Sequence, residues 1–276
     1  MPAEAGRPFT AIILAAQRAG QLDPLAAEAG VSHKCLVPIV GRPLIEYVLD
    51  ALADTPGVRA IRICVEPEVT EQVKLVPGAS GERGIPVDYV PAAATITESV
   101  YQSAAGVEGP ILVTTADNVN LTPQAVLATM APIARGQADC TIALASRDAV
   151  IAARKPGEAA HVTYDNVGPY KFRDGRYSNC NLYGFAGPHV LKPAEAFREG
   201  GQFSKQRQRL TKFVGPVNIL LYVLKLMSLR MAMKRISRRM GVRIEAVLLD
   251  DGSQAIDVDN PRTYRIAETI LKRKAG

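Results

Sequence analysis

Short runs of apolar, β-branched residues alternate with helix-like spacing over the first half of the chain. The runs predict strands at residues 9–16, 60–65, 87–90, 111–115 and 139–145. Between them, apolar residues at intervals of three and four predict helices at 43–53, 68–75, 97–105 and 123–135. Strands that alternate with helices imply right-handed βαβ units and a mostly parallel sheet. We therefore expect an α/β protein with a Rossmann-like, doubly wound sheet.

The pattern changes after residue 160. Short extended pieces with turn residues predict a small β-rich insertion beside the sheet at 161–185. Strand character returns at 243–249, and the spacing at 261–272 predicts a closing helix. No internal repeat divides the 276 residues, which are enough to bury a substantial core. We expect a single domain, 1–276.

Charge is distributed unevenly along the chain, although the net charge is only +6. Residues 203–243 contain eleven Lys or Arg and no Asp or Glu, so the rest of the chain, with 22 basic and 27 acidic residues, is mildly acidic. A uniformly basic nucleic-acid binder would not show this contrast. Aromatic residues make up 5% of the sequence and Trp is absent, so a surface that stacks the bases of single-stranded nucleic acid is not expected either. We expect no nucleic-acid partner.

The basic segment 203–243 has the pattern of an amphipathic helix pair. Lys225 and Arg230 interrupt its apolar run too early for a membrane-spanning helix. In one interpretation the helices pack on the sheet or in a homodimer, with their basic side chains in water, and we favour this one. In the other, residues 213–240 rest on an anionic membrane or admit a lipid-like acceptor.

Cysteine and histidine are few and scattered. The four cysteines form no CxxC pair, and the three histidines do not cluster with them, so neither a zinc site nor a disulfide framework is expected. The first seven residues lack the basic and apolar regions of a signal peptide. We expect a cytoplasmic protein, or one peripheral to the inner face of the membrane if the basic segment contacts lipid.

The loop after the first predicted strand is the first candidate for chemistry. It begins Leu14-Ala15-Ala16-Gln17-Arg18 and leads to Lys34. A loop that leaves a strand can direct successive backbone N–H groups at phosphate oxygens, and small residues allow close approach. Lys34 and Arg18 would add positive charge for a triphosphate. On spacing alone, an ordinary surface loop is the better explanation.

Two acidic residues form the second candidate. Asp117 directly follows the apolar strand that ends near residue 115, and Asp257 precedes the closing helix. Ligands of α/β proteins bind beyond the carboxyl ends of parallel strands, and Mg²⁺ prefers one or two carboxylates together with phosphate oxygens. The alternative is a turn or helix cap, which applies most strongly to Asp259 in Asp-Asn-Pro.

In chain order, these stretches resemble the signature of the nucleotidyltransferase superfamily, which includes sugar-1-phosphate nucleotidylyltransferases and molybdenum cofactor guanylyltransferase. Residues 34–45, Lys-Cys-Leu-Val-Pro-Ile-Val-Gly-Arg-Pro-Leu-Ile, match its pattern at nearly every position. The resemblance implies a glycosyltransferase-A-like fold and Mg²⁺-dependent transfer of NMP from an NTP to a phosphorylated small-molecule acceptor, with release of pyrophosphate. It gives catalytic roles to Lys34, Asp117 and Asp257, the last two as metal ligands.

The resemblance also implies contacts to both substrates. Residues 14–18 would bind the triphosphate with Lys34, Thr97 and Ser99 would contact the base and ribose, and CTP or GTP is favoured over ATP. Lys171 and Asn181 lie in a stretch similar to the family's acceptor strand and would bind the acceptor. Thr97 also fits an ordinary helix N-cap, and Lys171 a solvated hairpin.

The opening loop departs from the family pattern, because Gln17 and Ala19 stand where the family has glycines. The alternative is a catalytically degenerate, nucleotide-binding regulatory or scaffolding protein of the same fold. A dinucleotide-binding oxidoreductase would need a Gly-x-Gly-x-x-Gly turn after the first strand, and this turn is missing.

Overall fold

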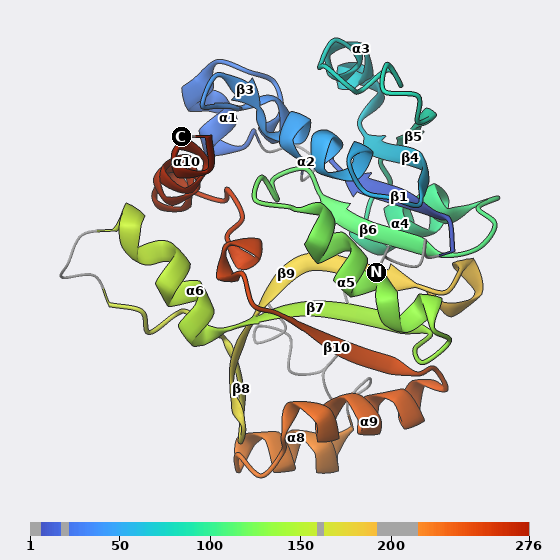
Figure 1. Ribbon diagram of the computed structural model, residues 1–276, viewed down its shortest axis with the longest axis vertical. Helices are drawn as coiled ribbons and strands as arrows, with labels where there is room; N and C mark the ends of the chain where they lie inside the picture. Colours follow the sequence, from blue (N-terminus) through green and yellow to red (C-terminus); the bar gives the residue numbers. More distant parts are fainter. Residues whose placement is uncertain (1–6, 18–21, 159–162, 192–214, 276) are drawn as a thin grey trace, which may run out of the picture.

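The structure, a computed structural model, describes residues 7–17, 22–158, 163–191 and 215–275. Its centre is an eight-stranded sheet in the order β10-β7-β9-β6-β1-β4-β5, with β8 paired to β9 (Figure 1). The strands are β1 (Phe9–Leu14), β4 (Val58–Val65), β5 (Val87–Pro91), β6 (Ile111–Thr115), β7 (Cys140–Ser146), β8 (Tyr170–Phe172), β9 (Gly175–Phe185) and β10 (Ile244–Leu249). Neighbours are parallel except where β9 is involved. The predicted α/β fold with a mostly parallel sheet is confirmed.

Helices cover both faces of the sheet, because successive strand residues point to opposite sides. In β1, Ile13 belongs to the apolar cluster of α2 (Leu44–Ala53) and α5 (Pro123–Ala134). The neighbouring Ile12 belongs to the cluster of α4 (Ile96–Ala104) and α9 (Leu229–Met240). Both isoleucines are fully buried. The sheet is therefore doubly wound, as predicted.

The remaining elements connect these layers. A third apolar cluster joins α1 (Pro24–Ala29) to the closing helix α10 (Pro261–Ala275). The other helices are α3 (Thr70–Lys74), α6 (Arg147–Arg154) and α8 (Pro216–Val223). Short 3-10 turns are η1 (Lys34–Leu36), η2 (Pro67–Val69), η3 (Lys155–Gly157), η4 (Pro188–Val190) and η7 (Gly252–Ala255), and β2 (Pro38–Ile39) pairs with β3 (Arg42–Pro43). Helices α1 and α6 were not predicted from the sequence.

Side-chain caps determine where the helices begin. Thr122 accepts a hydrogen bond from Ala125 N, so α5 starts at Pro123, where proline has no N–H to lose. Thr95 accepts from Glu98 N at 3.2 Å and starts α4 at Ile96. The N-cap of α4 is therefore Thr95, and the interpretation of Thr97 as a cap was wrong.

Strand β9 lies inside the sheet rather than beside it, which corrects the expectation for residues 161–185. It pairs antiparallel with both β6 and β7 and joins the two halves of the sheet. Its register against β7 shifts between Ile142 and Leu144, whose partners are Tyr183 and Asn179. At this bulge Asn181 adopts a left-handed backbone with φ +47°, which asparagine tolerates better than most residues.

The described part of the basic segment forms α8 and α9, which lie together at one end of the molecule (Figure 1, bottom). Residues 203–214 lie outside the described residues. Helix α9 begins at the cap Ser228 and packs on the edge strand β10 through Met240 and Ile244. Among the described residues, no helix is long and apolar enough to cross a membrane.

Candidate functional site

Lys34 and Asp117 meet at the carboxyl ends of the central strands. Asp117 follows β6, whose end at Thr115 pairs with Leu14 of β1, and Lys34 starts the η1 turn. The Lys34 ammonium lies 2.5 Å from Asp117 Oδ2 and 2.7 Å from Asp259 Oδ1. The side chains of Lys34 and Asp117 are mostly buried, whereas that of Asp259 is 63% exposed. Two of the three predicted catalytic residues are therefore in direct contact.

Asp257 reaches the same place from the far end of the chain. The segment before it is fixed by Asn120, whose side chain donates to Ile256 O at 3.4 Å and whose carbonyl accepts from Gln254 Nε2 at 2.6 Å. Val258 N then donates to Asp117 O at 3.3 Å. These bonds bring Asp257 beside Asp117, as the sequence predicted for the two carboxylates.

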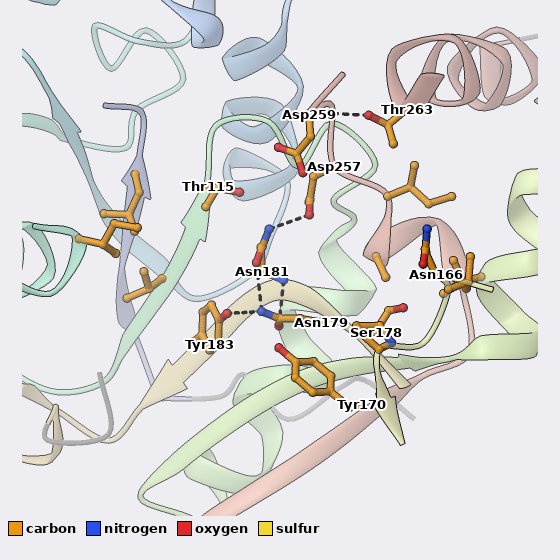
Figure 2. Close-up of a pocket in the computed structure, with 18 of the residues that line it drawn as sticks. Thr115, Asn166, Tyr170, Ser178, Asn179, Asn181, Tyr183, Asp257, Asp259 and Thr263 are labelled. Atoms are coloured by element: carbon orange, nitrogen blue, oxygen red, sulfur yellow. Dashed lines mark hydrogen bonds between the residues drawn. The ribbon is translucent and has the colours of Figure 1, made fainter. Parts of the chain in front are cut away.

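A chain of polar side chains runs along β9 to Asp257 (Figure 2). Asn181 Nδ2 donates to Asp257 Oδ2 at 2.6 Å. Asn179 Nδ2 donates to Asn181 Oδ1 at 3.1 Å and also to the hydroxyl of Tyr183. The bulge at Asn181 makes this contact possible, because it turns the asparagine toward the C-terminal segment. Asn181 thus belongs to the site, in contact with a predicted metal ligand.

The site holds more negative than positive charge. Burial raises the pKa of the Asp257 carboxyl well above its usual range, and the carboxylates of Asp117 and Asp259 raise it further. Burial alone would lower the pKa of Lys34. The carboxylates of Asp117 and Asp259 outweigh this effect of burial, so the pKa of Lys34 is raised. Three carboxyl groups therefore share a single ammonium group, which leaves them only partly neutralised, and this arrangement favours a further cation.

The donor set fits a magnesium ion held together with a phosphate ligand. Asp117 Oδ1 and Asp257 Oδ1 are both buried and have no hydrogen-bond partner among the described residues. The described residues contain no cluster of three or more His, Cys, Asp or Glu able to hold a metal by themselves. Mg²⁺ does not require one, since it keeps water and phosphate oxygens among its ligands.

The opening loop is held by Glu66, at the start of η2. Gln17 N donates to Glu66 Oε1 at 2.9 Å, and the other oxygen of Glu66 lies 3.3 Å from His33 Nε2. The side chain of Gln17 donates to Ser32 O at 3.2 Å. These contacts connect the loop to the segment that carries Lys34. Of the predicted loop residues, Leu14, Ala15, Ala16 and Gln17 are described, and Arg18 lies outside the described residues.

A cavity of about 500 Å³ extends from the carboxylates between β9, α4 and α6. Its polar lining includes Thr97, Thr115, Asn166, Tyr170, Asn179, Asn181, Tyr183, Asp257, Asp259 and Thr263. Arg154 is the one Lys or Arg among the described residues that line it. The Arg154 side chain is 15% exposed, and its Nε has no hydrogen-bond partner among the described residues. A cavity of this size accommodates a small organic ligand.

Of the described residues predicted to bind substrate, Leu14, Thr97 and Asn181 line the cavity, whereas Ala15, Ala16, Gln17, Lys34, Ser99 and Lys171 do not. Ser99 is buried, and its hydroxyl accepts a bond from Ala93 N at 2.9 Å, which fixes the turn before α4. Lys171 is exposed on β8, where residues alternate between faces and its neighbour Tyr170 is the one that lines the cavity. The structure brings Thr97 and Asn181 to the cavity, but not Ser99 or Lys171.

The sequence interpretation also missed residues that line the cavity. Asp259 was taken mainly as a helix cap, yet it pairs with Lys34. Its position two residues after Asp257 was a usable signal, because alternate residues of an extended segment share a face. Arg154 gave no such signal, since the helix that carries it was not predicted.

Comparison with known proteins agrees with this geometry, which is that of a nucleotidyltransferase. Residues 11–211 match the MobA-like NTP transferase domain. The chain belongs to that family, and the resemblance found in its sequence is confirmed.

Solved structures share the fold of this chain, and one relative shares part of its sequence. A hypothetical transferase from Thermus thermophilus is 24% identical, with a TM-score of 0.68 over 94% of this chain and 99% of that one. The 4-diphosphocytidyl-2C-methyl-D-erythritol synthase of Anaerococcus prevotii is 13% identical, with a TM-score of 0.60 over 97% of each chain. These two likenesses show the fold. The 2-C-methyl-D-erythritol 4-phosphate cytidylyltransferase of Gloeobacter violaceus is 36% identical over 70 residues, which are 25% of this chain and 30% of that protein.

Proposed function

We propose that this protein transfers an NMP unit from an NTP, with CTP or GTP preferred, to a phosphorylated small-molecule acceptor, in a reaction that requires Mg²⁺ and releases pyrophosphate. The observation that carries the proposal is the convergence of Lys34, Asp117 and Asp257 at one end of a cavity, at the carboxyl ends of β1 and β6. Lys34 and Asp259, which are 225 residues apart in the sequence, pair at the same place, and neither a turn nor a helix cap requires such a contact.

The nucleotide would bind at the end of the cavity that β1 and α4 line. Leu14 and Thr97 line this end, and Lys34 lies beside it. The preference for CTP draws support from two cytidylyl-transferring relatives: the Gloeobacter violaceus protein, and a CMP:2-keto-3-deoxy-manno-octonic acid synthetase solved with CTP, which is 14% identical with a TM-score of 0.57. The preference for GTP is kept from the sequence resemblance.

Asp117 and Asp257 would hold the magnesium ion. When bound, this ion would supply positive charge to the phosphate oxygens of the reacting nucleotide. Lys34 contributes a second positive charge from the chain itself and holds Asp117 in position. An oxygen of the acceptor phosphate forms a bond to the α-phosphorus, and the bond from that phosphorus to the bridging oxygen of pyrophosphate breaks. A phosphomonoester is already ionised at neutral pH, so no side chain has to remove a proton.

The acceptor phosphate would lie between the α-phosphate of the nucleotide and Arg154. This guanidinium lines the cavity, and its nearest carboxylate among the described residues is that of Glu158, at 3.8 Å. Glu158 is paired more closely with Arg262, at 2.6 Å. One carboxylate thus lies between two guanidinium groups, and the positive charge of Arg154 is not neutralised by it. Asn166 and Thr263 offer hydrogen-bonding groups in the same cavity. Arginine suits a phosphate because its planar group can bind two oxygens at once.

The test has two stages, and the first is nucleotide binding. Thermal unfolding is measured with ATP, CTP, GTP and UTP, each with and without Mg²⁺, for the wild type and Asp117→Asn. A ligand at about a hundred times its Kd adds roughly 2.7 kcal/mol of stability, which is a rise of several degrees for a chain of this size. We expect CTP or GTP to give this rise only with Mg²⁺, and only in the wild type. The proposal fails if no nucleotide shifts the melting temperature.

The second stage measures pyrophosphate release with sugar phosphates and polyol phosphates as acceptors. Arg154→Met should raise the acceptor KM by roughly tenfold or more, since a charge-assisted hydrogen bond is lost, while the melting shift given by the nucleotide stays that of the wild type. Lys171→Met is the matched control, because that side chain is exposed and does not line the cavity. An equal rise in both variants would contradict the role given to Arg154.

One observation favours the degenerate alternative, in which nucleotide binds without turnover. The Gln17 N–H, which a phosphate-binding loop would direct at its ligand, is bonded to Glu66. Mg²⁺-dependent nucleotide binding without pyrophosphate release on any acceptor would support a regulatory or scaffolding role.

A further inference from the structure

Helix α8 presents an apolar stripe to the outside of the molecule. Val217, Leu220 and Leu224 are 60%, 57% and 56% exposed. At 100° per residue these three positions fall within an arc of about 60° on the helix surface. Burial of such side chains is the main driving force of folding, so a stripe of three exposed ones marks a contact surface.

The inner face of α8 shows that this orientation is built into the structure. The ring of Tyr222 packs edge-on against Phe172 with centroids 5.4 Å apart, and its hydroxyl accepts a bond from Lys171 N at 3.0 Å. Asn218 accepts a bond from the Arg235 side chain of α9. By helix periodicity, Tyr222 lies roughly opposite the stripe. The contacts that hold the helix therefore turn its leucines outward.

Helix α9 lies at the same end of the molecule as α8 (Figure 1), and it carries a basic face. Its inner side is anchored by the buried residues Leu229, Ala232 and Met240. On the opposite side, Met231, Lys234 and Arg238 are all exposed. Lys234 and Arg238 form no ion pair with a described residue. The sequence between residues 215 and 243 contains no Asp or Glu that could neutralise them.

We propose that the outer faces of α8 and α9 form a docking surface for a bilayer that contains anionic lipids. The apolar stripe would enter the boundary between headgroups and acyl chains, while Lys234 and Arg238 bind the anionic headgroups. Charge complementarity selects this occupant: a second copy of the surface would bring one uncompensated basic face against another. The proposal is independent of the nucleotide chemistry.

The experiment is cosedimentation of the full chain with two kinds of vesicle, neutral phosphatidylcholine alone and phosphatidylcholine with phosphatidylglycerol. We expect binding to the anionic vesicles at 50 mM NaCl, little binding to the neutral ones, and release as the salt concentration is raised. Lys234→Gln with Arg238→Gln should lower the partition coefficient by roughly 25-fold, about fivefold for each charge. Leu220→Gln with Leu224→Gln should lower it by at least about tenfold.

Matched controls separate a docking surface from a general effect of charge or apolarity. Leu75→Gln removes an 84% exposed leucine of another surface, and Lys272→Gln removes a basic side chain that is 60% exposed on α10. Both should bind vesicles like the wild type, and all variants should keep the wild-type melting temperature because the altered side chains are exposed. Equal binding to neutral and anionic vesicles would overturn the proposal. So would a dimer, seen by size-exclusion chromatography with light scattering, that Leu220→Gln dissociates and that binds no vesicles.

Discussion

Replacing Asp257 by asparagine should stabilise the protein while removing its activity. Burial and the neighbouring carboxylates raise the pKa of Asp257, so in the folded state its ionised form is disfavoured. Its Oδ1 has no hydrogen-bond partner among the described residues. Asparagine cannot ionise, so Asp257→Asn removes the charge that burial and the two carboxylates disfavour and should raise the free energy of unfolding by about 1–3 kcal/mol. Its Oδ2 contact can be retained, because an asparagine oxygen can still accept from Asn181.

The stabilisation should depend on pH in a defined direction. A carboxyl whose folded-state pKa is raised holds its proton more tightly in the folded protein, so unfolding releases a proton. Wild-type stability therefore falls as the pH rises from about 4, the pKa of an unfolded aspartate, through the folded-state pKa. The gain from Asp257→Asn should be larger at pH 8 than at pH 5. It is measured by urea unfolding in EDTA, and turnover in Mg²⁺ should fall by at least about a hundredfold.

Asp139→Asn provides a control of opposite sign. Hydrogen bonds from the Arg243 side chain lower the pKa of Asp139, and Arg243 N donates to it at 2.8 Å. Stability from this pair is present above the unfolded pKa of about 4 and is lost only as the pH falls through the folded value. Asp139→Asn should therefore destabilise equally at pH 5 and pH 8. The reasoning about Asp257 is refuted if its variant is less stable than the wild type at pH 8, or if the gain is the same at both pH values.

Two further substitutions test the charge network of the site and the packing beside it. Lys34→Met should lower pyrophosphate release by about a hundredfold or more. It should also lower the melting temperature, because Asp117 loses its partner. Adding Asp257→Asn should restore part of that stability, and stability changes that simply add in the double variant would contradict a shared charge network. Gly252→Ala should destabilise by more than about 2 kcal/mol in urea unfolding, since its Cβ would lie 2.1 Å from Ala149 C and 2.2 Å from Ala149 O. An unchanged midpoint would show that η7 is free to move away from α6.

The sequence predicted those parts of the site that depend on residues close together along the chain. The motif from Lys34 to Ile45 is a continuous stretch, and the position of Asp117 follows from the end of an apolar strand, so both could be located without a structure. The pairing of Lys34 with Asp259 and the contact of Asn181 with Asp257 depend on tertiary structure. No local pattern encodes contacts between such distant residues.

The place of β9 shows a second limit. Its alternation and turn residues correctly predicted extended structure, but not which strands it would join. Its buried residues include neighbours such as Tyr177 and Ser178, so it is covered on both faces, and this fits the interior of a sheet. Burial is known only from the structure, and the bulge at Asn181 and the register against β7 likewise arise only on pairing.

The distance along the chain between Lys34 and Asp259 has a consequence for synthesis on the ribosome. Strands β1, β4 and β6 can pair early, but the carboxylates at 257 and 259 emerge only after β10. Until β10 is made, β7 is an edge strand with unpaired backbone groups, a form that invites intermolecular association. A chain interrupted before residue 244 would be an aggregation hazard that lacks both late carboxylates. Pairing of β7 with β10 and completion of the site therefore follow one another closely, since the two carboxylates come directly after β10 in the chain.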